Sequence, residues 1–354
     1  MDNPFSISFG KKPLQYISRY SSTNDIIETF ESENPSTQAY MLVGVRGAGK
    51  TVMLSMIASE LSEEEDWIVL ELNPTRSLLE SLAAKLYAIP KMSKAFIESK
   101  IDLSLLGIGL SMEKGNKIFD IEQAIDTMLV IVKKKKKKVL IVLDEVTNNQ
   151  FVKEFASAFQ IYIRKDYPLF LLMTGLYENV YSLQNDKSLT FLYRTPKVML
   201  DALNITSILV TYQKVFGISP EEARRMAQLT KGYPFAFQVL GYLFWKEKDN
   251  LSKDGFVKTY EKIMPVFDHM LQEYVYEKVW NELSLIERNI ICYVAKNENV
   301  RIKDIRENLK MDSDKFTVYR SRLIKKGIIK SEGYGTISIC LPRFEEYIRE
   351  IYTE

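Results

Sequence analysis

The chain has 354 residues, of which 46% are hydrophobic and 27% charged, the balance of a globular protein with a sizeable core. Its 48 lysines and arginines stand against 46 aspartates and glutamates, so the formal net charge is only +2 and any nucleic-acid surface must come from local clustering. The single histidine and two cysteines, Cys292 and Cys340, cannot form a zinc site, and we interpret the cysteines as buried small hydrophobes. No apolar run approaches the ~18 residues of a membrane span and no signal peptide is apparent, which favours a cytoplasmic protein without a membrane partner.

Short apolar runs alternate with helical periodicity through the first 200 residues. The apolar runs predict buried strands over residues 40–43, 67–72, 139–143, 169–174 and 197–200. The helical spacing predicts helices over residues 24–32, 50–61, 77–87 and 121–132. Strands separated by helices predict a parallel sheet with helices on both faces. Residues 101–112 alternate in polarity and carry two glycines, which predicts an inserted strand or hairpin without assignable chemistry.

A glycine-rich loop follows the strand predicted over residues 40–43. It matches the pattern GxxxxGK[ST] in full, as Gly44, Val45, Arg46, Gly47, Ala48, Gly49, Lys50 and Thr51, with Val52 next. Glycines let backbone N–H groups face a phosphate, and the positive end of the helix that begins at Lys50 attracts the same group. We expect Lys50 to reach the β- and γ-phosphates and Thr51 to bind Mg²⁺. The strand, loop and helix together predict a P-loop that binds ATP or ADP.

Two acids, Asp144 and Glu145, end the strand predicted over residues 139–143 and indicate the second half of the site. We expect Asp144 to hold Mg²⁺ together with Thr51, and Glu145 to act as general base toward the attacking water. The pair favours ATP hydrolysis over nucleotide binding alone. The alternative, a strand that simply ends in solvated acids, is weaker because the glycine-rich loop lies in the same chain.

Other polar residues of this region allow two interpretations each. Thr174 ends a predicted strand and is either a sensor of the γ-phosphate or a capping threonine. Arg194 is either an arginine finger that reaches the nucleotide of a neighbouring subunit in a homo-oligomer, or a surface arginine. Arg46 belongs to the nucleotide loop or simply packs on the surface. We interpret the six lysines over residues 133–138 as a solvated loop rather than a DNA or lipid patch.

The pattern changes after about Asp201, where strand-like runs stop and helical periodicity continues to about Val279. Helices are then predicted over residues 284–296, 302–309 and 313–326, followed by a hairpin over residues 328–341 with a glycine-rich tip. Three helices and a hairpin outline a winged helix-turn-helix. The predicted fold class is therefore α/β, with a P-loop NTPase sheet over residues 1–200, a helical lid over 201–279 and a winged helix-turn-helix domain over 280–354.

The helix predicted over residues 313–326 combines an apolar face with a basic one. Phe316, Tyr319 and Leu323 share the face that we expect to pack on the core. The positive side chains are Lys315, Arg320, Arg322, Lys325 and Lys326, with Lys330 beyond and Tyr334 at the hairpin tip. No acid interrupts residues 315–330, which favours contact with double-stranded DNA. A winged helix that docks a protein partner is the alternative.

The chain resembles a family of prokaryotic AAA+/STAND-like ATPases, described as archaeal-type or replication-initiator-like. The resemblance is carried by Asn3-Pro4-Phe5, GVRGAGKT, VLIVLDE, GYPF and SRLIKKGIIKSEGYGTISICLPRFEEYI. It implies an ATPase core, a lid, a winged helix, and an extra strand between the loop strand and the acid strand, which we expect to be residues 67–72. It also implies that Gly232 and Pro234 contact nucleotide, the alternative being an ordinary helix start with proline in its first turn. We therefore expect a nucleotide-dependent DNA-binding switch, the alternative being a signalling or regulatory ATPase whose winged helix binds protein.

Overall fold

The computed structural model describes residues 2–8, 10, 12–98, 121–186, 189–298, 300–333 and 335–352. The chain divides into two compact units. The sheet unit consists of Tyr20–Val43 and Lys50–Met199, and the helical unit consists of Met1–Arg19, Gly44–Gly49 and Leu200–Glu354. The strand or hairpin predicted over residues 101–112 lies outside the described residues.

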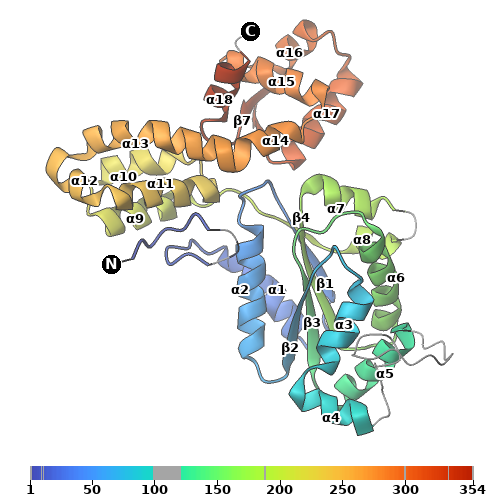
Figure 1. Cartoon of the computed structure of the whole chain (residues 1–354). Helices are drawn as coiled ribbons and strands as arrows, with labels where there is room; N and C mark the ends of the chain where they lie inside the picture. The colour runs from blue at the N-terminus through green and yellow to red at the C-terminus, as the bar shows by residue number, and fades with distance from the viewer. Residues whose placement is uncertain are drawn as a thin grey trace. The chain divides into compact units, whose positions relative to one another are not determined.

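The sheet unit is built, in its described residues, on five parallel strands in the order β2-β3-β4-β1-β5 (Figure 1). The strands are β1 (Ala39–Val43), β2 (Trp67–Leu72), β3 (Lys138–Leu143), β4 (Leu169–Gly175) and β5 (Lys197–Met199). The parallel sheet predicted from alternating strands and helices is thereby confirmed.

The strand that separates β1 from β3 is β4, and not the strand over residues 67–72 as expected. That strand, β2, lies at the edge of the sheet beyond β3. The burial of the two strands explains their places. Every residue of β4 is buried, as a central strand covered on both faces requires, whereas β2 exposes Glu71. Order along the chain therefore misled the prediction, because an apolar composition marks a central strand better than its place in the sequence.

Helices cover both faces of the sheet (Figure 1). On one face lie α1 (Tyr20–Glu31) and α2 (Lys50–Glu63), where the rings of Phe30 and Phe170 lie 5.1 Å apart. On the other face, α3 (Leu78–Tyr87), α5 (Ile121–Lys134) and α6 (Gln150–Arg164) share one hydrophobic core with alternate strand residues. Successive side chains of a strand point to opposite faces, so one apolar strand can serve both packings.

Several helices of this unit were not predicted from residue spacing. They are α4 (Pro90–Glu98), α6, α7 (Tyr177–Gln184) and α8 (Thr190–Arg194). In the lysine run over residues 133–138, residues 133–136 are exposed, as expected of a solvated segment, whereas Lys138 is only partly exposed and begins β3. Lys138 donates hydrogen bonds of 3.3 and 3.0 Å to the carbonyls of Phe30 and Glu31, and its ammonium lies 5.1 Å from the ring centroid of Trp67. This lysine therefore fastens α1 to the sheet.

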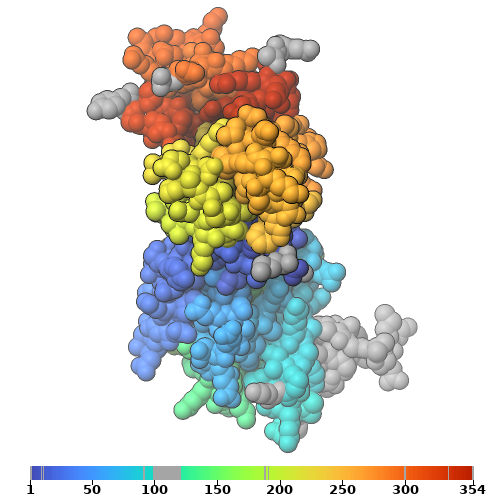
Figure 2. Space-filling model, turned by 90° about the vertical axis from the view of Figure 1, so that its left-hand side faces the viewer, coloured from blue at the N-terminus to red at the C-terminus, as the bar shows by residue number. Residues whose placement is uncertain are grey.

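A set of packed helices forms the part of the helical unit that the sequence predicts as a lid, and this part is called the lid below. They are α9 (Ile205–Phe216), α10 (Pro220–Leu229), α11 (Pro234–Lys246), α12 (Lys248–Asp254), α13 (Phe256–Leu271), a π-helical turn η2 (Gln272–Tyr276) and α14 (Glu277–Asn281). Figure 2 shows α9 and α10 in yellow beside α12 and α13 in orange. Phe5 is buried among Tyr212, Phe216 and Phe237, so the start of the chain packs on the lid.

The C-terminal part of the helical unit has the order of elements predicted for a winged helix. It comprises α15 (Leu285–Lys296), α16 (Ile302–Asn308), α17 (Ser313–Lys325), the antiparallel strands β6 (Ile329–Gly333) and β7 (Thr336–Ile339), and α18 (Phe344–Ile351), which was not predicted. Cys292 and Cys340 are partly rather than fully buried, and burial raises the pKa of the Cys340 thiol to about 11. None of the described helices is both long and apolar enough to cross a membrane.

Candidate nucleotide-binding site

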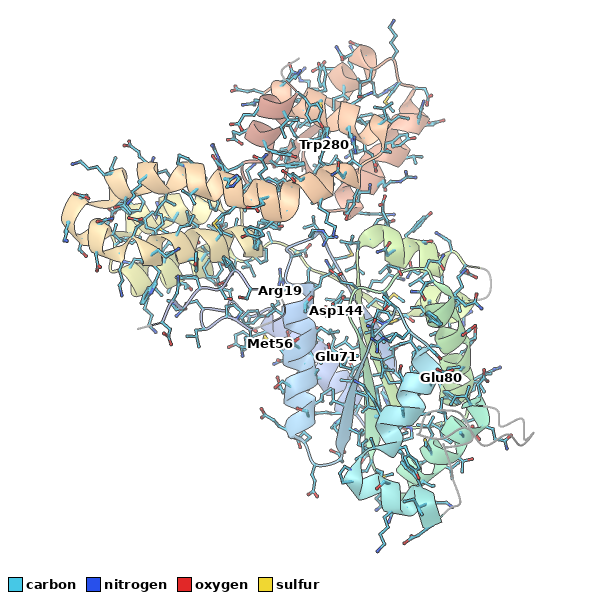
Figure 3. The ribbon with its side chains drawn as sticks, in the orientation of Figure 1. Arg19, Met56, Glu71, Glu80, Asp144 and Trp280 are labelled. Carbon is cyan, nitrogen blue, oxygen red and sulfur yellow. The ribbon has the colours of Figure 1, made fainter. Side chains whose placement is uncertain are left out.

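The sheet unit brings the predicted metal ligands together. Lys50 and Thr51 open α2, with the partly buried Val52 next, and Asp144 directly follows β3 (Figure 3). The Thr51 hydroxyl donates a hydrogen bond of 2.9 Å to Oδ2 of Asp144. A hydroxyl and a carboxylate at this separation are the hard oxygen donors that Mg²⁺ prefers. The geometry of this half-site therefore fits a magnesium ion.

Thr174 organises the two acids that follow β3. Its side chain is fully buried, and its hydroxyl donates to Oδ1 of Asp144 and accepts a 2.8 Å hydrogen bond from the N–H of Glu145. That N–H lies also 3.1 Å from Oδ1 of Asp144. Glu145 has a φ of +53°, a left-handed conformation that is uncommon away from glycine and is typical of functional positions. Its side chain is exposed, as a group that meets a substrate must be.

The glycine-rich loop, Gly44–Gly49, belongs to the helical unit. Gly47 and Gly49 have φ values of +76° and +86°, which residues with a Cβ rarely adopt. The Ala48 N–H donates a 3.1 Å hydrogen bond to the Val45 carbonyl and closes the turn. Alternation of left-handed glycines with other residues curls a backbone into the concave nest of N–H groups that binds phosphates.

The lid contacts the loop through the GYPF motif. The hydroxyl of Tyr233 donates a 2.5 Å hydrogen bond to the carbonyl of Arg46. A Cβ placed on Gly47 would lie 2.1 Å from that hydroxyl, so only glycine fits there. Pro234 opens α11, and a Cβ on Gly49 would lie 4.0 Å from its Cβ. Pro234 therefore lies beside the loop, and its contact with nucleotide stays a prediction.

Gly232, the first residue of this motif, packs closely against another segment of the lid. Its φ is +75°, and its carbonyl accepts a 2.7 Å hydrogen bond from the N–H of Leu203. A Cβ on Gly232 would lie 2.6 Å from the Leu203 carbonyl oxygen. Glycine is thus required here for close packing of two lid segments, which gives this residue a structural task within the motif.

Arg19 is a residue of the loop environment that sequence reasoning missed. Its guanidinium donates hydrogen bonds of 3.2 Å to the carbonyl of Ala48 and 2.7 Å to the carbonyl of Asp201 (Figure 3). Burial lowers the pKa of Arg19, partly offset by Tyr16 and Asp201. A single arginine in a polar segment carries no pattern that distinguishes it from a surface residue, so the sequence held no signal for it.

Two further arginines, Arg46 and Arg194, were expected to contribute to the site. The guanidinium of Arg46 is 3.0 Å from the carboxylate of Glu282, at the end of α14, so its side chain is engaged by the helical unit. Arg194 ends α8 in the sheet unit and is exposed. Its role as an arginine finger remains a prediction that concerns a neighbouring subunit.

The basic residues of the C-terminal part are divided by burial. Phe316 and Leu323 are buried as predicted, and Lys315, Arg322 and Lys325 are exposed on α17. Arg320 is partly buried and donates a 2.7 Å hydrogen bond to the hydroxyl of Ser331 on β6. Tyr334 lies outside the described residues.

Lys326 is a correction to the predicted DNA-binding set. It is buried, and its ammonium lies 2.9 Å from the carboxylate of Glu287, which is buried as well. The reason is its position. Lys326 is the C-cap of α17, where the chain turns toward β6 and carries the side chain inward. Its charge is thus matched inside the fold and is not available to a phosphate.

Comparison with known proteins agrees with this architecture. A family model described as a domain of unknown function (DUF8462) matches residues 273–348, and no curated protein matches the sequence. The structure is similar to the ORC2 protein of Aeropyrum pernix in its ADPNP–ADP complexes, with a TM-score of 0.59, 11% identity, and 97% of this chain and 96% of that chain covered. It is similar to the ADP form of ORC2, with a TM-score of 0.50, 11% identity and the same coverage, 97% and 96%.

The CDC6P structure from Pyrobaculum aerophilum matches with a TM-score of 0.48 and 14% identity over 100% of this chain and 97% of that chain. The likeness to ORC2 establishes the fold. The chain therefore shares the fold of that protein over nearly its whole length.

Proposed function

We propose that this protein binds ATP at the loop Gly44–Gly49 with Lys50 and Thr51, and hydrolyses it. The observation that carries the proposal is the contact of Thr51, Asp144, Thr174 and Glu145 at the ends of β3, β4 and the start of α2. The loop supplies N–H groups for the phosphates and Lys50 a positive charge. Thr51 and Asp144 would hold Mg²⁺, which neutralises charge on the phosphates when bound.

Glu145 is the general base of this proposal. Its exposed carboxylate accepts a proton from the water that attacks the γ-phosphate, and its backbone is fixed by Thr174. The ADPNP–ADP complexes of ORC2, which has the same fold, support a nucleotide as the ligand.

The test is nucleotide binding and phosphate release by the full chain with Mg²⁺. We expect Lys50→Ala to lose ATP affinity, and Glu145→Gln to keep ATP affinity while hydrolysis falls by roughly 10²–10⁴-fold. Glu60→Gln, an exposed acid on α2, is the matched control and should hydrolyse ATP as the parent does. A Glu145→Gln protein with parental turnover would remove Glu145 from the mechanism.

We further propose that the C-terminal winged helix binds double-stranded DNA and that nucleotide state sets its affinity. The exposed cations of α17, Lys315, Arg322 and Lys325, support contacts with the phosphate backbone. Val318 is 55% exposed on the same helix and offers an apolar contact to a thymine methyl group in the major groove. Lys330 pairs with Glu332 at 2.8 Å, which makes the hairpin less positive than α17.

A DNA titration with ATP, ADP and no nucleotide tests this proposal. Reversing Arg322 and Lys325 to glutamate should abolish DNA binding, and reversing Lys253 and Lys258 of the lid, with the same change in net charge, should not. The parental affinity should fall with salt, by a slope of about 0.9 per phosphate contact. Equal affinity in all nucleotide states would contradict a switch. No DNA binding at all would favour the alternative, a regulatory ATPase whose winged helix docks a protein.

A further inference from the structure

Two side chains that are not part of the loop Gly44–Gly49 donate hydrogen bonds to its carbonyl groups. Tyr233 donates to the carbonyl of Arg46 at 2.5 Å, and Arg19 donates to the carbonyl of Ala48 at 3.2 Å. The two donors come from distant parts of the sequence, the lid and the segment before α1, and all belong to the helical unit.

Because the peptide group is planar, each of these two hydrogen bonds also fixes the direction of the N–H group of the following residue. Among the described residues every peptide bond is trans, and in a planar trans peptide the carbonyl and the following N–H point in opposite directions. A donor that holds the Arg46 carbonyl therefore directs the N–H of Gly47 to the opposite side. A donor on the Ala48 carbonyl does the same for the N–H of Gly49.

Gly47 and Gly49 are the two glycines of the loop in the left-handed conformation, at φ +76° and +86°. Left-handed glycines are the most mobile positions of such a loop, because they lack the Cβ that restricts other residues. Without an external support their N–H groups would sample several directions. Ordering them at the moment of binding would subtract from phosphate affinity.

We propose that Tyr233 and Arg19 are positioning residues that aim the N–H groups of Gly47 and Gly49 at the phosphates of the nucleotide. The inference rests on the proposed nucleotide binding and names the groups that pre-organise it. Tyr233 stands between Gly232 and Pro234, the motif residues implied by the resemblance, and acts through its hydroxyl alone. Its buried phenol stays protonated, and hence a donor, at any pH at which the protein is handled, because burial raises its pKa.

The test for Tyr233 is a single-atom change in the full chain, Tyr233→Phe, with Tyr212→Phe as control. Tyr212 is also a buried lid tyrosine, and its hydroxyl donates a 2.7 Å hydrogen bond to the carbonyl of Phe237, away from the loop. Both variants lose one buried hydroxyl-to-carbonyl bond and should lower the unfolding temperature similarly. We expect Tyr233→Phe alone to weaken both ADP and ATP binding, each roughly tenfold, measured by calorimetry.

The test for Arg19 is Arg19→Lys, which keeps the charge and loses the planar fork. Its control is Arg288→Lys, since Arg288 likewise donates to two carbonyls, those of Trp280 at 3.1 Å and Asn281 at 3.4 Å. We expect Arg19→Lys to weaken ADP binding roughly fivefold, by the loss of one aimed donor, and Arg288→Lys to leave it unchanged. The weakening should persist at high salt, because the direction of an N–H group is not screened as a charge is.

These binding measurements distinguish failure of the positioning role from failure of the proposed nucleotide binding. Parental binding of ADP together with unchanged binding by Tyr233→Phe would overturn the positioning role and leave the proposed function intact. Equal weakening by Tyr233→Phe and Tyr212→Phe would also overturn it, because general loosening of the lid would then explain both. A parent that binds neither ATP nor ADP would overturn the proposed function and this inference with it.

Discussion

Lys326 and Glu287 form a buried ion pair, 2.9 Å between ammonium and carboxylate, that joins the end of α17 to the start of α15. Glu287 also closes the capping box of α15, where its carboxylate accepts a 2.8 Å hydrogen bond from the N–H of Ser284. The neighbouring residue Lys325 is exposed. Two adjacent lysines thus have opposite tasks, one inside the fold and one on its surface.

Replacement of Lys326 by methionine is expected to destabilise the C-terminal part. The substitution leaves the Glu287 carboxylate buried without its cation, which typically costs about 3–5 kcal/mol. Chemical unfolding followed by fluorescence measures the loss. Lys325→Met is the matched control and should change the free energy of unfolding by less than about 0.5 kcal/mol. Equal stability of the two variants would show that the pair contributes nothing.

The same pair predicts a pH dependence of stability. Burial alone would raise the pKa of Glu287, but hydrogen bonds from Lys326 and Ser284 outweigh it and hold the pKa below its ordinary value of 4.5. A carboxyl whose pKa is lower in the folded chain stabilises the fold above pH 4.5, and this stabilisation disappears as the pH falls through the folded-state pKa. Unfolding curves between neutral and acid pH should show this loss in the parent. Glu287→Gln should flatten the curve, and an unchanged slope would contradict the assignment.

Lys326 also marks a limit of prediction from sequence. The run of cations over residues 315–330 correctly indicated a basic helix, because helical spacing separates its buried Phe316 and Leu323 from the exposed side. The predicted end of the helix, residue 326, is within one residue of the observed end, but spacing does not indicate which way the chain turns there, and Lys326 lies at that turn. A side chain at a helix end takes its direction from tertiary packing, which the local pattern does not contain.

The nucleotide site likewise contains residues that the sequence predicted and residues that it did not. The loop and the Asp144-Glu145 pair were predictable because their chemistry requires particular residues at fixed spacing beside strands. Arg19 was not, since a hydrogen bond to a backbone carbonyl can come from any donor of suitable length. The strand between β1 and β3 was misassigned for a related reason. Chain order places residues 67–72 between the two strands, but sheet order follows burial, and β4 is the fully buried strand.

Substitution of Thr174 is expected to slow ATP hydrolysis while leaving nucleotide binding intact. Valine keeps the shape of threonine but removes the hydroxyl that fixes Asp144 and the N–H of Glu145. We expect Thr174→Val to hydrolyse ATP roughly 10–100-fold more slowly, because the general base is no longer held in place, with little change in ADP affinity. Thr174→Ser retains the hydroxyl and should recover most of the activity. Phosphate release under saturating ATP provides the measurement.

The control for Thr174 is Thr195→Val. Thr195 is another buried threonine of the sheet unit, and its hydroxyl donates to the carbonyl of Phe191 at 3.3 Å, with no contact to the acids. Its replacement should affect stability more than turnover. Full activity in Thr174→Val would mean that Glu145 is positioned without it.

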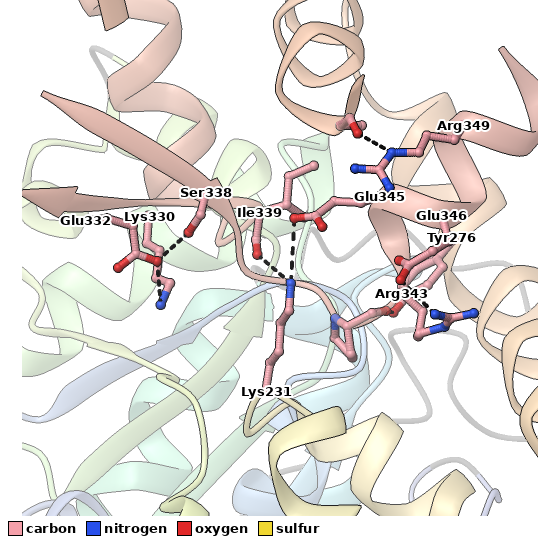
Figure 4. A network of polar contacts seen from close by, with 12 residues as sticks. Lys231, Tyr276, Lys330, Glu332, Ser338, Ile339, Arg343, Glu345, Glu346 and Arg349 are labelled. Carbon is pink, nitrogen blue, oxygen red and sulfur yellow. Dashed lines mark hydrogen bonds and ion pairs between the residues drawn. The ribbon is translucent and has the colours of Figure 1, made fainter. Parts of the chain in front are cut away.

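Lys231 is expected to carry nucleotide state to the C-terminal part. It precedes the GYPF residues that contact the loop, and its ammonium lies 3.1 Å from the carbonyl of Ile339 on β7 and 3.7 Å from the carboxylate of Glu345 on α18 (Figure 4). One short turn thus contacts the nucleotide loop and the hairpin. Lys231→Met should leave ATP affinity near the parental value and reduce the difference in DNA affinity between the ATP and nucleotide-free states.

Contacts of α18 that do not involve Lys231 allow the loss of coupling to be distinguished from a loss of structure. Arg343 donates hydrogen bonds of 2.8 and 2.6 Å to the two carboxylate oxygens of Asp268, so α18 stays fastened to α13 in the Lys231→Met protein. Lys262→Met is the control, because it breaks a 2.7 Å pair with Glu247 inside the lid. DNA titrations of the three proteins with and without ATP give the ratio of affinities that defines coupling. If the ratio in Lys231→Met equals that of the parent, Lys231 does not carry the signal to the hairpin. The next contact to break would then be the ion pair between Arg46 of the loop and Glu282 at the end of α14, whose charged atoms lie 3.0 Å apart.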